Sequence, residues 1–150
     1  MQHFLVVRKA FLIATLVYAC NFVLGTVVAV ALNLSADPTL GSASNTWFAS
    51  GTPLSAPGVF MIPYVIFLVL VTRQHWMGTV GVAGVTLLTL ISGMASLADR
   101  DMVQRALTQQ PAILTVVTLV VLFITIPTIV ILGILTLIWQ WRVRTRPALP

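Results

Sequence analysis

The sequence predicts an all-α integral membrane protein, an up-and-down bundle of four transmembrane helices that makes residues 1–150 a single domain. The first observation is composition: hydrophobic residue types make up 59% of the 150 residues and charged types 7%, with a mean hydropathy of +1.04. A soluble domain carries about a quarter charged residues, so this chain has too little polar surface to cover a globule in water. The second observation is four apolar segments without a charged side chain. Each is close to the ~20 residues that a helix needs to cross a ~30 Å hydrocarbon core.

Polar or turn-forming residues separate these segments. Residues 35–57 are rich in Ser, Gly, Ala, Thr and Pro, and form the long outer loop of the predicted bundle. Only residues 73–77 join the second and third segments, so these two must form an antiparallel hairpin. Pro111 falls at the start of the last segment, where its missing N–H costs nothing. The four spans are therefore predicted at residues 10–34, 54–72, 78–98 and 112–139.

The positions of Lys and Arg predict the orientation, because basic residues concentrate on the cytoplasmic side of a membrane. Six of the eight basic residues lie before the first span, in the hairpin or after the last span, whereas Arg100, Arg105, Asp37, Asp99 and Asp101 lie in the other connections. Both termini are therefore predicted to be cytoplasmic in a multi-pass protein of the cell membrane, with a bacterial inner membrane as the expected compartment. Three Trp residues fall at the same boundary, which amphipathic rings prefer. The predicted inner-interface anchors are Arg8, Lys9, Arg73, Trp76, Trp139, Trp141, Arg142, Arg144 and Arg146.

Small and uncharged polar residues inside the spans are the candidate functional positions. Asn21 lies near the middle of the first span, where an amide needs a hydrogen-bond partner on another helix. In the third span Thr79, Thr86 and Gly93 recur every seven residues, and several Thr residues with Gly133 mark a similar seam in the fourth. Such positions either let helices pack closely or line a polar solute path, and both interpretations stay open. The candidates are Asn21, Gly25, Ala29, Thr79, Ala83, Thr86, Thr89, Gly93, Ser96, Thr115, Thr118 and Thr125.

Two prolines lie inside predicted spans, Pro63 in the second and Pro127 in the fourth. Because proline removes a backbone hydrogen bond one turn back, both helices are predicted to bend.

The chain offers no chemical signature that would identify an activity. His3, His75 and Cys20 are not clustered, so we expect no metal site, no catalytic residues and no cofactor. We expect no nucleic-acid partner, because no basic run is interleaved with base-stacking aromatics. The leading hypothesis is a membrane subunit or accessory protein that acts through helix–helix packing, with the lipid bilayer and either a homo-oligomer or a larger membrane protein as partners. The first alternative is a small oligomeric channel or transporter for a small or apolar solute. The second alternative is a lipid-modifying membrane enzyme.

Overall fold

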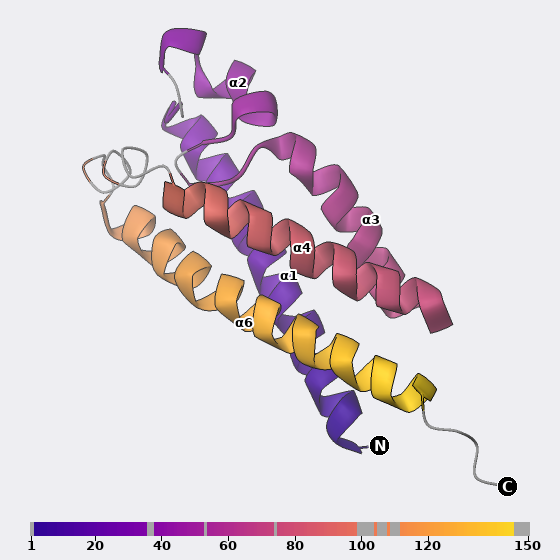
Figure 1. The fold of residues 1–150 in the computed structure, drawn as a ribbon. Helices are drawn as coiled ribbons and strands as arrows, with labels where there is room; N and C mark the ends of the chain where they lie inside the picture. The colour runs from indigo at the N-terminus through magenta and orange to yellow at the C-terminus, as the bar shows by residue number, and fades with distance from the viewer. Residues whose placement is uncertain are drawn as a thin grey trace, which may run out of the picture.

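The chain folds into helices that run side by side along most of the molecule (Figure 1). The computed structural model describes residues 2–35, 38–52, 54–73, 75–98, 104, 108 and 112–145. The α-helices named within these residues are α1 (Gln2–Ala31), α2 (Ala43–Ser50), α3 (Met61–Thr72), α4 (His75–Ala98) and α6 (Ala112–Thr145). Two short 3₁₀ turns, η1 (Pro38–Leu40) and η2 (Gly58–Phe60), lie between α1 and α3.

Three of these helices are long and apolar enough to cross a membrane. Their candidate spans are Leu5–Ala31 in α1, Trp76–Met94 in α4 and Val116–Val143 in α6. The prediction of an all-α membrane protein with several spans is confirmed. Less than half of the most apolar 18-residue stretch of each span is buried inside the chain, at 39%, 39% and 28% respectively, so the remaining apolar surface suits a lipid environment better than water.

The second predicted span, residues 54–72, is not a full-length helix, so the structure does not establish four transmembrane helices. The continuous apolar helical stretch is Gly58–Thr72. The twelve residues of α3 rise about 18 Å and the three of η2 add about 6 Å, which falls short of a ~30 Å core. The hydropathy pattern placed Leu54 at the start of a helix. Instead, reciprocal backbone hydrogen bonds between Thr52 and Ser55, at 2.9 and 3.2 Å, form a tight turn here.

The two prolines of the predicted spans lie at different places in their helices. Pro63 is the third residue of α3, directly after η2. Pro127, by contrast, lies inside α6, which continues as helix on both sides of it.

The first helix is longer than predicted at its start and ends in a defined cap. It begins at Gln2 rather than at residue 10, and Asn33 follows its end with a positive φ of 53°. The Leu34 N–H donates to the Ala29 carbonyl at 2.7 Å, and the Asn33 N–H donates to the Val30 carbonyl at 3.1 Å. This pair of bonds is a Schellman cap, in which Asn tolerates the left-handed conformation that most residues avoid.

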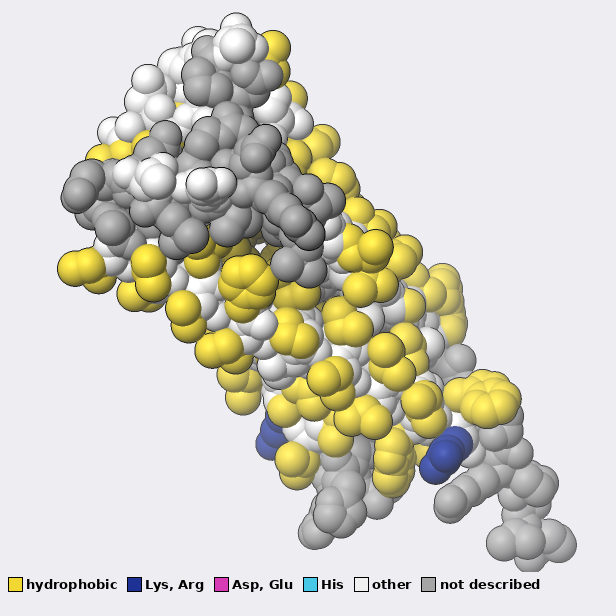
Figure 2. Space-filling view, turned by 60° about the vertical axis from the view of Figure 1, so that its left-hand side comes forward, with side chains coloured by type: hydrophobic (Ala, Val, Ile, Leu, Met, Phe, Trp, Pro, Cys, Tyr) yellow, Lys and Arg dark blue, Asp and Glu magenta, His cyan; other side chains and the backbone are white. Residues whose placement is uncertain are grey.

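The helices form a bundle in which α4 lies between α3 and α6, and α1 packs across α6. In Figure 1 the start of α1, the junction of α3 with α4 and the end of α6 share the lower end of the molecule, whereas α2 lies at the upper end. Helices α1, α3, α4 and α6 all contribute to one buried cluster: Phe11, Ala14, Tyr18, Tyr64, Val71, Val82, Val85 and Ile129. Figure 2 shows apolar side chains along the length of the outer surface and Lys or Arg only towards the lower end of this face.

Candidate functional site

The predicted seam of small and hydroxylated residues in the third and fourth spans lies where α4 crosses α6. A Cβ atom added at Gly133 would collide with the Thr86 side chain, and one added at Gly93 would come within 2.7 Å of Ile126 Cγ2. The glycines are therefore the positions at which the two helices approach most closely. Thr86 is buried, and its hydroxyl donates to the Val82 carbonyl of its own helix at 2.7 Å.

Threonine hydroxyls of α6 are bonded in the same way. Thr125 donates to the Val121 carbonyl and Thr136 to the Leu132 carbonyl, both at 2.7 Å. A hydroxyl that donates to the carbonyl one turn back has its hydrogen occupied and does not need water or a solute.

Asn21 links α1 to α6 by a hydrogen bond, as predicted for an amide inside an apolar helix. Its side chain is buried, and its Nδ2 atom donates to the Thr118 carbonyl at 3.4 Å, which is long for a hydrogen bond. Thr118, another predicted position, is itself buried.

Gly25 and Ala29 pack against a loop rather than against another helix. A Cβ atom at Gly25 would lie 2.6 Å from the Leu54 carbonyl oxygen, and Ala29 is buried in a small cluster with Leu34 and Leu54. The turn is held to α1 by the Thr26 hydroxyl, whose oxygen lies 2.8 Å from Ser55 Oγ. The segment that was predicted to begin the second span thus covers the C-terminal part of α1.

The remaining predicted positions differ in their surroundings. Thr79 is half-buried and Ala83 is exposed on the outer face of α4. Thr89 is fully buried. The side chains of Ser96 and Thr115 lie outside the described part of the chain.

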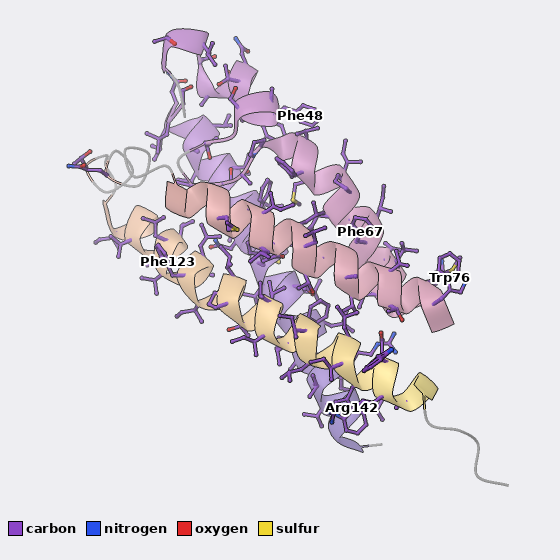
Figure 3. All side chains as sticks on the ribbon, in the orientation of Figure 1. Phe48, Phe67, Trp76, Phe123 and Arg142 are labelled. Carbon is purple, nitrogen blue, oxygen red and sulfur yellow. The ribbon has the colours of Figure 1, made fainter. Side chains whose placement is uncertain are left out.

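A row of glycines on α4, which the sequence analysis did not single out, brings α3 and α4 together. A Cβ atom at Gly78 would lie 2.5 Å from the Arg73 carbonyl oxygen, and one at Gly81 would meet the backbone of α3 at Val71. One at Gly84 would meet the ring of Phe67, which Figure 3 places where α3 faces α4. The signal in the sequence was the spacing of three residues, which keeps these glycines on nearly one side of a helix.

A pair of buried tyrosines, which the sequence did not predict as a site, lies at the centre of the bundle. The rings of Tyr18 on α1 and Tyr64 on α3 have centroids 5.5 Å apart. The Tyr18 hydroxyl donates to Ser92 Oγ on α4 at 3.0 Å, and the Tyr64 hydroxyl donates to the Thr15 carbonyl at 3.4 Å. The Thr89 hydroxyl is near Tyr64, but no hydrogen-bond geometry joins the two, so its oxygen is buried without a partner. The sequence offered one indication of this pair: the chain has two tyrosines, and each lies inside an apolar segment.

Among the predicted inner-interface anchors, Arg8 has a specific structural role. Its Nη2 atom donates to the Val71 carbonyl at 2.6 Å and to the Arg73 carbonyl at 3.2 Å. These carbonyls lie at the end of α3, where helical carbonyls lack intrahelical donors and favour a positive charge. Arg8 therefore caps α3 from α1.

The other described anchors are at the same end of the bundle. Figure 3 shows Trp76 and Arg142 there, on α4 and α6. Their side chains are exposed, as are those of Lys9, Arg73, Trp139 and Trp141. The Arg144 side chain and Arg146 lie outside the described residues, as do Asp37, Asp99, Arg100, Asp101 and Arg105.

At the opposite end, α1 and α3 diverge around a cavity of about 670 Å³, which we call the α1–α3 cavity. Six of its lining residues come from the last third of α1, two from α2, and three from η2 and the start of α3. They are Phe22, Val23, Thr26, Val27, Val30, Ala31, Trp47, Phe48, Gly58, Met61 and Ile62.

The described residues contain no group of three or more His, Cys, Asp or Glu side chains that could hold a metal ion. Comparisons of the chain with known protein families, curated proteins and solved structures find no match.

Proposed function

We propose that this chain is a membrane subunit or accessory protein that acts by packing its helices against a second membrane protein or a second copy of itself. One observation carries this choice over a solute path: the crossing of α4 with α6 is closed by contact between Thr86 and Gly133. The Thr stripe that would have lined a path is used for packing, with the Thr86 hydroxyl bonded within α4.

The surface proposed for this contact is the outer face of α4. Val80, Ala83, Leu87 and Leu90 are exposed there, at alternating spacings of three and four residues. This is the repeat by which two helices interlock over several turns. The small Ala83 lies within it, and small residues let membrane helices approach closely.

The test of this surface is assembly. The chain is extracted from its native membrane in a mild detergent, and the mass of the intact complex is measured. We expect a stoichiometric partner or a closed homo-oligomer. Ala83→Leu should weaken that assembly about tenfold, because the larger side chain separates the helices, whereas Cys20→Leu on exposed α1 surface should leave it unchanged. A chain that extracts as a monomer at native concentration would refute the proposal.

We further propose that the chain crosses the membrane four times, with both termini in the cytoplasm of a bacterial cell. The start of α1, the α3–α4 junction and the end of α6 share one end of the bundle, which supports this topology (Figure 1). In this arrangement α3 with η2 supplies about 24 Å of the second crossing, and the turn at Thr52–Ser55 adds to it.

An impermeant maleimide applied to intact cells tests the topology. Cys20 is first replaced by Ala, and single cysteines are placed at Ser44 on α2 and at Val143 near the end of α6, both of which are exposed. We expect Ser44→Cys to react from outside and Val143→Cys to react only after the cells are opened. Reaction of Val143→Cys in intact cells would overturn the topology.

A further inference from the structure

We propose that the α1–α3 cavity binds the acyl chains of one phospholipid from the bilayer leaflet on the side of α2. This proposal goes beyond the packing function, because it concerns a surface on α1, α2 and α3 rather than the outer face of α4. The cavity holds about 670 Å³ and no charged side chain lines it. The hydroxyl of Thr26 is hydrogen-bonded inside the protein, with Ser55 Oγ at 2.8 Å and the Phe22 carbonyl at 2.9 Å. The lining therefore suits an uncharged, apolar occupant.

The depth of the cavity corresponds to one leaflet. Its α1 lining runs from Phe22 to Ala31, which is about 14 Å along the helix axis, or close to half of a ~30 Å hydrocarbon core. The cavity lies where α3 begins only at Met61, so that the last third of α1, the short helix α2 and the start of α3 leave open space between them. Space of this length and direction is what lipid acyl chains occupy in the surrounding bilayer.

The volume of the cavity fits the acyl chains of one phospholipid. A chain of methylene groups in van der Waals contact is about 4 to 5 Å across. Two such chains, each extended over 14 Å along α1, fill roughly 450 Å³, which the 670 Å³ of the cavity can hold.

The end of the cavity near α2 is formed by aromatic side chains. The rings of Trp47 and Phe48 meet edge to face, with centroids 5.6 Å apart. Trp47 packs directly on Gly58, where a Cβ atom would collide with its ring, and Figure 3 shows Phe48 beside the start of α3. Trp prefers the level of the headgroups, where its ring is apolar and its N–H is hydrated. We therefore expect the polar part of the lipid to lie next to α2.

Retention of lipid tests the proposal on the full chain. The chain is loaded with phosphatidylcholine in mixed micelles, washed with lipid-free detergent, and analysed by native mass spectrometry. We expect one phosphatidylcholine per chain to remain. Val27→Phe places a bulky ring in the cavity between α1 and α3 and should reduce the retained fraction about tenfold. Leu24→Phe is the matched control, because Leu24 lies within one helical turn of Val27 and is similarly exposed, at 63% against 59%, but does not line the cavity.

A second measurement leaves the cavity intact, so it does not depend on the folding of Val27→Phe. Trp76, Trp139 and Trp141 are replaced by Phe, so that Trp47 is the one tryptophan that remains. Phosphatidylcholine with dibrominated acyl chains should quench Trp47 in the washed complex, because bromine quenches on contact. Three results would overturn the proposal: a wild-type chain that retains no lipid, an equal loss in Val27→Phe and Leu24→Phe, or retained brominated lipid that leaves Trp47 unquenched.

Discussion

Replacing Arg8 by Met should destabilise the folded bundle by about 2 kcal/mol, because Arg8 caps a helix more than sixty residues away in the chain. Its Nη2 atom lies 2.6 Å from the Val71 carbonyl oxygen and 3.2 Å from that of Arg73. A hydrogen bond to a charged group contributes about 1.5–3 kcal/mol, and a cation at a helix C-terminus adds about 0.3–1 kcal/mol. We take a total near the lower end of the combined range, because Arg8 is only half-buried and its second hydrogen bond is exposed to solvent. A loss of 2 kcal/mol lowers the folding equilibrium constant about thirtyfold.

The assay is reversible unfolding in mixed micelles with increasing SDS, followed by far-ultraviolet circular dichroism. Lys9→Met is the matched control, since it removes the same charge one residue further along α1 from an exposed position. Arg8→Lys should fall between the wild type and Arg8→Met, because an ammonium group keeps the charge but not the fork of donors. If Arg8→Met and Lys9→Met shift the unfolding midpoint equally, the effect comes from net charge and the capping argument is wrong.

Three further predictions concern packing, a side-chain hydrogen bond and a cap. Gly81→Leu should separate α3 from α4 and lower the free energy of unfolding by at least about 3 kcal/mol in the SDS assay, because the new side chain would meet the backbone of α3, which cannot move aside as a side chain can. Ala83→Leu on the exposed face of α4 should change the stability of the monomer by less than about 0.5 kcal/mol. Tyr18→Phe and Ser92→Ala should each cost about 1 kcal/mol, and the double variant should cost less than their sum if the 3.0 Å bond joins them. Asn33→Ala should speed amide exchange in α2 severalfold, because the Asn33 side chain accepts from the first N–H of that helix at 2.9 Å, and unchanged exchange would exclude this cap.

The sequence predicts the long helices of this fold well and the short one poorly, for a physical reason. Hydropathy measures whether a segment prefers lipid, so α1, α4 and α6 follow directly from it. It does not measure whether the backbone can continue as helix. The segment before Met61 is apolar enough to be counted, but Pro57 lacks an N–H and the turn at Thr52–Ser55 pairs its own backbone groups.

The candidate site shows a similar division between what is local and what is distant in the chain. Small residues in α4 are visible in the sequence, but their partners are not: Gly93 approaches α6, whereas Gly81 approaches α3. Asn21 was predicted to bond to another helix, and its acceptor lies 97 residues away on α6. Tyr18 and Tyr64 are brought together only when α1 and α3 pack. Residue spacing identifies a face of one helix and contains no information on which helix covers it.

The close approach of α3 to α4 also has a consequence for how the protein is made. The apolar stretch that ends with α3 is too short to cross the bilayer alone. Helix α4 begins at His75, three residues after the end of α3, and the α3 backbone packs against its glycines. An isolated α3 would leave unpaired backbone N–H and C=O groups at its end in the hydrocarbon core, and each such group costs several kcal/mol. During synthesis we therefore expect α3 to wait at the translocon until α4 emerges, and the two to enter the lipid together as a preformed hairpin.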